Sequence, residues 1–219
     1  SLETVVTGGD LRSQVSVSDE AALSAVTTAG VSLGNMSAEI EITQLARAQT
    51  VYSGFVATGS TVGQGNMTLT VGTASYSIAI GAANDSMTGL ADAINSANSG
   101  VRASVVQDGT NSRLVLKGAT GAASAFTLTA DSGADPALDR FTYGGTASQM
   151  TLGQSALDAT FKVDGIAYTR TSNIVADIMP GVADLEKGAT RCPGVADLRR
   201  ASAAAGRRSV LCSGRRRKL

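Results

Sequence analysis

The chain of 219 residues carries 18 basic and 18 acidic side chains, so its formal net charge is zero. The balance joins two unlike segments: residues 1–190 hold 9 basic and 17 acidic residues, whereas residues 191–219 hold 9 basic residues and one acid. His is absent, which excludes His-containing triads and metal sites, and both cysteines, Cys192 and Cys212, lie in the basic tail. We therefore expect an acidic body without thiol chemistry, distinct from its tail.

The first regular element predicted in this body is a strand. Residues 38–48 alternate apolar and polar side chains, with Ile40 and Ile42 on one face, and a period of two is typical of a strand with one buried face. The loop at 57–65 is rich in Gly, Ser and Thr, and we place a domain boundary there.

The most regular block spans residues 67–117. Two alternating runs, 67–71 and 76–80, are joined by a short connection that contains a glycine, which predicts a β-hairpin. A second hairpin is expected from 101–105 and 114–116, with a turn between them. The order predicted for this block is hairpin, helix, hairpin.

The helix of this block follows three candidate N-caps at residues 84–86. Its apolar positions form one stripe at helical spacing, consisting of Met87, Leu90, Ala91, Ile94 and Ala97. Residues 98–100, Asn-Ser-Gly, are expected to end the helix. Asn95 lies late in this helix, and we expect it to bond to neighbouring backbone rather than to a ligand.

A second turn signal lies near the end of the body. The alternating runs 160–163 and 166–169 flank Asp164-Gly165, which is the strongest short-range hairpin signal in the chain. Ser172-Asn173 is expected to cap a short turn that carries Ile174 and Ile178.

The polar loop between these regions contains three carboxylates. Phe126 and Leu128 predict one further strand, and Asp131, Asp135 and Asp139 follow it. Their spacing lacks the pattern of a calcium loop, so we interpret them as solvated. No catalytic, cofactor-binding or metal-binding constellation is recognised, and the expectation is a protein that is not an enzyme and needs no cofactor.

Three segments of the chain carry motifs that occur together in one family. Residues 86–95 with 100–106 resemble the flagellin IN motif, named for its Ile-Asn pair. Residues 156–165, with 171–174 and 177–182, look like the middle region of the flagellar filament cap family, hook-associated protein 2, and residues 42–49 fit the same family upstream. The motif positions are Leu90, Ala93, Ile94, Asn95, Val101, Ala103, Asp158, Ala159, Asp164, Gly165, Ser172, Asn173 and Gly181.

The resemblance implies an extracellular structural subunit of the bacterial flagellum that promotes flagellin assembly at the filament tip. It also implies export through the flagellar channel without a cleaved signal. The implied partners are flagellin, hook-filament proteins and further copies in a small ring; nucleic acid and membranes are not expected. Coiled-coil legs typical of the family are not seen, so we expect the outer portion of such a protein.

Two alternatives stay open. The chain could be a flagellin or another hook-associated filament component, because flagellins also carry the IN motif. It could also be a tip-exposed adhesin that binds host mucin or glycans through its loops, although the body has few aromatic residues for a glycan platform.

The expected fold class is α+β and mostly β, with antiparallel hairpins and short helices in two β-rich domains, one inserted in the other. Residues 1–58 with 156–190 are expected to form a discontinuous domain, and residues 59–155 the inserted domain with the IN motif. Residues 191–219 combine Arg, Ala, Gly, Pro and Cys, as a GC-rich gene does when read out of frame. We expect this tail to be disordered or non-native.

Overall fold

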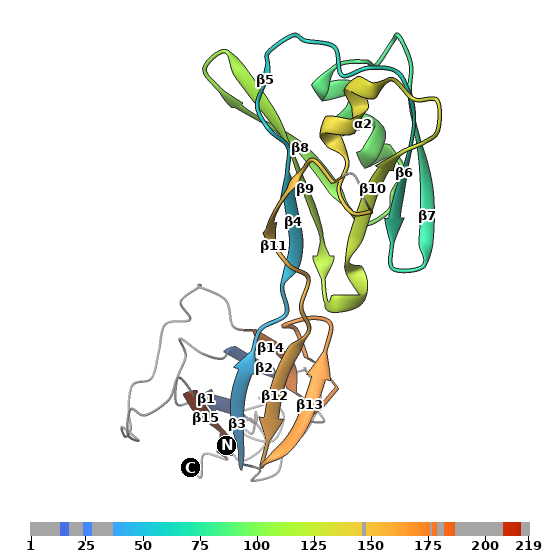
Figure 1. Ribbon diagram of the computed structural model, residues 1–219. Coiled ribbons are helices and arrows are strands. Elements are labelled where there is room, and N and C mark those ends of the chain that lie inside the picture. The colour runs from blue at the N-terminus through green and yellow to red at the C-terminus, as the bar shows by residue number, and fades with distance from the viewer. Residues whose placement is uncertain are drawn as a thin grey trace, which may run out of the picture. The chain divides into compact units, whose positions relative to one another are not determined.

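The computed structural model describes residues 14–17, 24–27, 37–145, 148–175, 177–178, 182–186 and 208–215 (Figure 1). The chain divides into two compact units, which we call unit 1 (Ser1–Leu45 with Ala159–Leu219) and unit 2 (Ala46–Asp158). Unit 2 is thus inserted into the sequence of unit 1. Residues 46–58, which the sequence pattern placed in the discontinuous domain, lie in unit 2.

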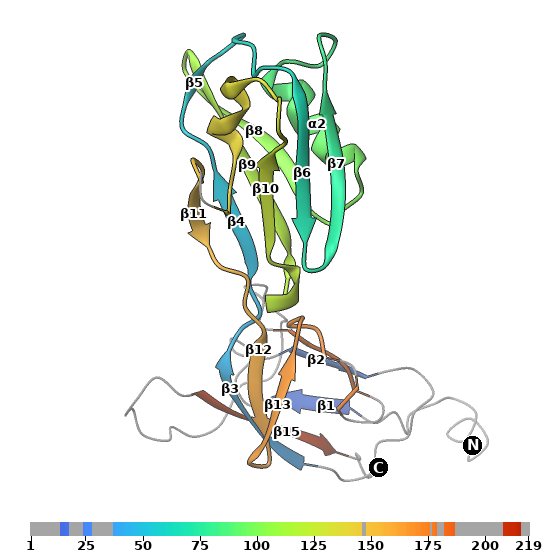
Figure 2. The ribbon, with the colours of Figure 1, turned by 45° about the vertical axis from the view of Figure 1, so that its right-hand side comes forward.

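Unit 1 is built from antiparallel strands. Its five-stranded sheet has the order β1 (Gln14–Val17), β15 (Arg208–Arg215), β3 (Ser37–Gln44), β12 (Ala159–Val163) and β13 (Ile166–Arg170), and a separate pair joins β2 (Ser24–Thr27) to β14 (Val182–Glu186). Figure 2 shows how β3 lies beside β12, although more than a hundred residues separate them in the sequence. The strand predicted at 38–48 is confirmed only as far as Gln44: residues 45 and 46 belong to no strand, because the chain passes there from unit 1 to unit 2, and Ala48 begins β4 (Ala48–Tyr52). The hairpin predicted at 160–169 is confirmed.

The core of unit 1 follows from strand alternation. Ile40 of β3 lies opposite Val163 of β12, and both side chains are buried on the same face of the sheet. Phe161, also buried, stacks on Tyr168 of β13 with ring centroids 5.9 Å apart. Aromatic pairs of this kind add about 0.5–1.5 kcal/mol to the burial of their surface. Val175, from the turn region after β13, completes the cluster.

The turn between β12 and β13 has the geometry that its sequence predicts. Asp164 has φ of 49° and Gly165 has φ of 82°, and a two-residue loop with positive φ at both positions is a type I′ turn. This turn is also tied to β3, because the Asp164 side chain accepts a hydrogen bond from the Glu39 amide at 2.8 Å and the Asp164 amide donates to the Glu39 carbonyl at 2.9 Å.

Unit 2 contains two sheets. One has the order β10 (Phe126–Ala130), β6 (Gly65–Val71), β7 (Ala74–Ile80); the other has the order β11 (Thr151–Gln154), β4 (Ala48–Tyr52), β9 (Asn111–Thr120), β5 (Val56–Ala57), and β8 (Arg102–Asp108) pairs with β9. The helices are α2 (Met87–Ser96) and the short 3-10 helices η1 (Ala122–Ser124) and η2 (Pro136–Phe141). The predicted hairpin, helix, hairpin order of residues 67–117 is confirmed.

The core of unit 2 lies between the second sheet and the elements that cover it. In Figures 1 and 2, α2, β6 and β7 lie on one side of the sheet formed by β4 and β9. Val51 of β4 and Leu114 and Leu116 of β9 point to that side and are fully buried. Leu90 and Ile94 of α2 reach the same core.

Part of the basic tail also forms a strand. The sequence predicts that residues 191–219 are disordered or non-native, and eight of them, Arg208–Arg215, form β15 against β3 and β1. The rest of the tail lies outside the described residues. Among the described residues, no helix has the length and apolar character needed to cross a membrane.

Candidate interaction site

The motif helix α2 begins at a tightly built corner. Of the three cap candidates, Ser86 is the N-cap, and its hydroxyl accepts a hydrogen bond from the Gly89 amide at 3.1 Å. Asn84 instead closes the turn after β7, since its side-chain oxygen accepts from the Gly81 amide at 2.7 Å. A Cβ at Gly89 would collide with the Asn84 carbonyl oxygen, so only glycine allows this close approach.

Asn95 joins α2 to β8 through both atoms of its amide. Its Nδ2 donates to the Ala103 carbonyl at 3.0 Å, and its Oδ1 accepts from the Ala103 amide at 2.9 Å. The side chain thereby satisfies an N–H and a C=O of the strand in the way that a neighbouring strand does. The expectation that Asn95 bonds to backbone is confirmed, and the bond explains why an amide stands at this position.

The other predicted motif residues of unit 2 pack around this clamp. Leu90, Ile94, Val101 and Ala103 are buried in the core, and Ala93 packs against it. Asp158 lies at the end of unit 2, where its carboxylate accepts a hydrogen bond from the Ala122 amide at 2.7 Å. These contacts are structural ones between elements of the same unit.

In unit 1, the motif residues lie in and around the β12–β13 hairpin. Ala159 is buried in β12, and Asp164 and Gly165 form the type I′ turn. The Ser172 hydroxyl accepts from the Ile174 amide at 3.0 Å, as the predicted cap requires. Asn173 lies in the same turn, while Gly181 lies outside the described residues.

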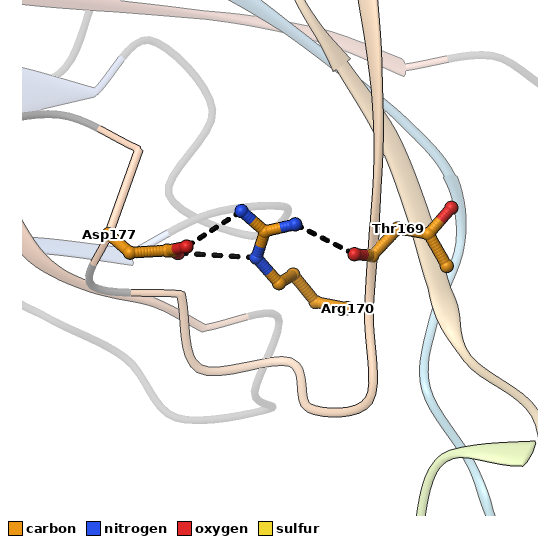
Figure 3. Close-up of polar contacts among 3 residues, drawn as sticks. All are labelled: Thr169, Arg170 and Asp177. Atoms are coloured by element: carbon orange, nitrogen blue, oxygen red, sulfur yellow. Dashed lines mark hydrogen bonds and ion pairs between the residues drawn. The ribbon is translucent and has the colours of Figure 1, made fainter. Parts of the chain in front are cut away.

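The turn after β13 is closed by an exposed ion pair (Figure 3). Arg170 donates to Asp177 through Nε at 3.3 Å and Nη2 at 2.7 Å, and through Nη1 to the Thr169 carbonyl at 2.8 Å. Hydrogen bonding to Arg170 lowers the pKa of the Asp177 carboxyl below its ordinary value, and the same bond raises the pKa of the Arg170 guanidinium.

Sequence reasoning did not single out a buried glutamine that links the two sheets of unit 2. Gln49 of β4 is 4% exposed, and its amide bonds to both backbone groups of Phe126 at the start of β10, each at 2.9 Å. Gln49 thus bonds to the backbone of a strand in the same way that Asn95 does. The only signal for it was a polar residue at a position that strand alternation leaves buried.

Sequence reasoning also missed a cluster on the outer face of the second sheet. Leu114 and Leu116 point inward, so Arg113, Val115 and Lys117 lie on the opposite face of β9. The guanidinium carbon of Arg113 lies 3.8 Å from the ring centroid of Phe55 and 5.5 Å from that of Tyr52. The outward positions could have been deduced from the inward pair; the approach of the two rings could not, because it depends on the pairing of β4 with β9.

Two of the three carboxylates of the polar loop, all of which the sequence predicts to be solvated, accept structural hydrogen bonds. Asp131 accepts a hydrogen bond from the Thr68 hydroxyl at 2.7 Å, and Asp135 caps η2 by accepting from the Ala137 amide at 2.8 Å. Asp139 is exposed on η2. In the described part of the chain, no group of three or more acidic or thiol side chains is arranged to hold a metal ion.

Comparison with known proteins gives this arrangement a family context. Residues 66–120, which run from β6 to the end of β9, match the family model of the flagellin hook IN motif. Flagellar hook-associated protein 2 of Escherichia coli K12 is 32% identical over 185 residues, which cover 80% of this chain and 39% of the relative. The chain is similar to part of flagellar hook-associated protein 2. It spans about two fifths of the length of the curated relatives that it matches.

Solved structures agree with this similarity in both units. The D2–D3 domains of the flagellar cap protein FliD from Escherichia coli superpose with a TM-score of 0.74 at 24% identity, covering 94% of this chain and 98% of that chain. The D2–D3 domains of FliD from Serratia marcescens give a TM-score of 0.67 at 27% identity, covering 78% and 95%. The mostly β architecture predicted from sequence is thus that of cap-protein D2–D3 domains.

Proposed function

We propose that the chain is the outer part of a flagellar filament cap subunit and that it acts as a structural assembly factor without catalysis. The observation that carries this proposal is the similarity to hook-associated protein 2 over 80% of the chain, which extends well beyond residues 66–120 of the IN motif. A flagellin would share the motif block, whereas the similarity to the cap protein includes unit 1 with its Asp164-Gly165 hairpin.

The proposed role places the chain outside the cell at the filament tip, after export through the flagellar channel. Its proposed partners are flagellin subunits, hook-filament proteins and further copies of a cap subunit. The IN-motif residues support this role by building the rigid end of unit 2, since Asn95 and Leu90 fix α2 to β8 and to the core. Binding of host mucin remains a separate prediction, which a mucin pull-down tests.

A domain replacement in a cap-deficient strain tests the proposal. The gene supplied encodes hook-associated protein 2 of Escherichia coli with its D2–D3 region replaced by this chain, because the chain alone matches about two fifths of that protein. We expect filaments to form and the leakage of unpolymerised flagellin to fall. The matched control carries Leu90→Asp, which places a charge in the core of unit 2 and should restore leakage.

Leakage that stays at the level of the cap-deficient strain, with the chimera exported and folded, would contradict the proposal. Incorporation of the chimera along the filament shaft, detected by gold labelling, would favour the flagellin alternative instead.

A further inference from the structure

We infer that Asp108-Gly109, at the tip of the β8–β9 hairpin, is a site of spontaneous isoaspartate formation in the folded chain. The modification reroutes the main chain through the side chain of Asp108 and needs no enzyme. The inference goes beyond the proposed function and does not depend on it. It rests on a contrast between the two Asp-Gly pairs of the sequence, because the other pair, Asp164-Gly165, has its carboxylate bound to backbone.

The reaction joins the side chain of Asp108 to the amide that follows it. The Gly109 amide nitrogen attacks Cγ of the protonated carboxyl; the N–Cγ bond forms, the Cγ–OH bond breaks, and the hydroxyl leaves with the amide proton as one water. The product is a five-membered succinimide. One water then opens this ring at either carbonyl, which restores aspartate or leaves Gly109 attached to Cγ as isoaspartate, and the mass of the chain is unchanged.

Glycine after the aspartate makes both pairs chemically competent. A Cβ on the following residue hinders the approach of its nitrogen to Cγ, and glycine has no Cβ. The sequence contains two Asp-Gly pairs and no Asn-Gly pair, which would react in the same way with loss of ammonia. The sequence therefore offers two equivalent candidates, and the structure separates them.

The side chain of Asp108 is exposed and unrestrained. Among the described residues, its carboxylate has no hydrogen-bond or ion-pair partner. Asp108 and Asn111 form the last pair of the β8–β9 ladder, and Gly109, with φ of 59°, begins the two-residue loop between them. The hydrogen bond that ties this loop to the chain after β5 runs from the Thr58 amide to the Thr110 carbonyl at 2.8 Å, and it leaves the reacting atoms free.

The motion that the reaction needs is small at this position. Asp108 must turn out of its extended conformation for its Cγ to meet the Gly109 nitrogen, and this opens only the terminal pair of the ladder. Local opening at frayed ends and loop tips costs far less than global unfolding, so the reactive conformation is visited within the native state.

The Asp164-Gly165 pair is exposed as well, but it is held in place. The Asp164 carboxylate accepts a hydrogen bond from the Glu39 amide at 2.8 Å, and the Asp164 amide donates to the Glu39 carbonyl at 2.9 Å. To react, Asp164 must give up both hydrogen bonds and leave the type I′ turn. The loss of two hydrogen bonds lowers the population of the reactive conformation, and we expect a rate at least about tenfold lower than that of Asp108.

The modification would loosen one edge of the second sheet of unit 2. Isoaspartate adds a carbon to the main chain at position 108, so the ladder cannot keep its register at the tip. The strand β5 pairs with this end of β9, through Val56 with Ser112 and Ala57 with Asn111, and should detach with it. Leu114 and Leu116 are fully buried farther along β9 and should stay in place.

Timed incubation of the folded 219-residue chain at mildly acidic pH, followed by tryptic digestion, tests the site. Cleavage after Lys and Arg places the two pairs on separate peptides, residues 103–113 and residues 163–170. Electron-transfer fragmentation distinguishes isoaspartate from aspartate in each peptide. We expect isoaspartate at Asp108 to form at least about tenfold faster than at Asp164 in the folded chain, and at a similar rate in both peptides when the chain is unfolded in urea.

Asp108→Glu is the matched control. Glutamate keeps the charge but would need a six-membered ring, so the variant should form no isoaspartate in peptide 103–113 and should keep the unfolding midpoint of wild type. Hydrogen exchange measures the structural consequence. In aged wild type, the Thr58 amide should exchange at least about tenfold faster than in fresh protein while that of Leu116 is unchanged, and aged Asp108→Glu should show neither change.

Three outcomes would overturn the inference: no isoaspartate at Asp108 in the folded chain, equal rates at Asp108 and Asp164 in the folded chain, or the same difference in rate in urea, which would assign it to sequence instead of structure. The replacement experiment in the cap-deficient strain is scored independently. A chimera that suppresses flagellin leakage while Asp108 stays unmodified would refute the inference and leave the proposed function standing, and the reverse result would do the opposite.

Discussion

Unit 1 and unit 2 use the same antiparallel hairpins but are held together differently. Among the described residues, the buried cluster of unit 2 contains nineteen apolar side chains, whereas that of unit 1 contains five. The chain has no Trp and only eight Phe and Tyr residues. The described core of unit 2 is therefore built from many aliphatic side chains on two sheets and a helix, whereas the described core of unit 1 centres on a stacked ring pair beside its turn.

The side-chain hydrogen bonds and ion pairs described for the two units also differ in how deeply they are buried. Gln49 and Asn95 bond to backbone inside unit 2, where little water competes with them. In unit 1, the hydrogen bond between Asp164 and Glu39 and the ion pair between Arg170 and Asp177 lie at the surface. We therefore expect that removing a buried hydrogen bond of unit 2 lowers the free energy of unfolding more than removing an exposed contact of unit 1. The following changes test this.

The largest effect is expected from Leu90→Ala. Leu90 is fully buried in α2, and a buried Leu→Ala change costs about 2–5 kcal/mol through lost burial and the cavity left behind. Amide hydrogen exchange should show the loss in unit 2, with the β12–β13 hairpin little affected. Leu152→Ala is the control, since Leu152 is 43% exposed. Equal destabilisation of both units would show that they unfold as one.

Asn95→Ala is expected to have the next largest effect. It leaves the N–H and C=O of Ala103 without the side-chain partner they have in α2, which costs about 1–3 kcal/mol in the free energy of unfolding. Urea unfolding at equilibrium measures this. Asp92→Ala changes an exposed residue of the same helix and should shift the midpoint little. If Asn95→Ala lowered the free energy of unfolding no more than Asp92→Ala does, water would be replacing the two hydrogen bonds that Asn95 makes to Ala103.

Gly165→Ala tests the turn on which unit 1 depends. Gly165 has φ of 82°, and an L-residue in this left-handed conformation costs about 1–2 kcal/mol. The free energy of unfolding of unit 1, measured by equilibrium urea unfolding, should fall by this amount, and that of unit 2 should not change. Gly54→Ala is matched, because an added Cβ there meets nothing within 4 Å and no left-handed φ is involved. If the two variants behaved alike, the turn would not limit the stability of unit 1.

The sequence predicted the local elements of this fold because local chemistry decides them. Alternation fixed the hairpins of unit 2, and the Asp164-Gly165 pair fixed the type I′ turn. Which strands meet across long separations is decided by packing, so the pairing of β4 with β9 and of β10 with β6 could not be deduced. The motif residues were found from family resemblance, whereas the rings around Arg113 appear only once those strands are paired.

The smallest effect is expected from Asp177→Asn, which removes the exposed ion pair of unit 1. Its carboxyl has a lowered pKa because of Arg170, so the native state binds protons less readily than the unfolded state. The pair therefore stabilises the fold above the ordinary pKa of Asp, and this contribution disappears as the pH falls through the lowered value. The variant should be slightly less stable than wild type at pH 7, and the difference should vanish in acid, as followed by thermal unfolding across that range. Asp108→Asn, in unit 2, controls for net charge. If the variant stayed less stable than wild type below the lowered pKa, Asp177 would be acting through packing of the turn and not through its charge. The contacts of unit 1 would then resemble those of unit 2 more closely than their exposure indicates.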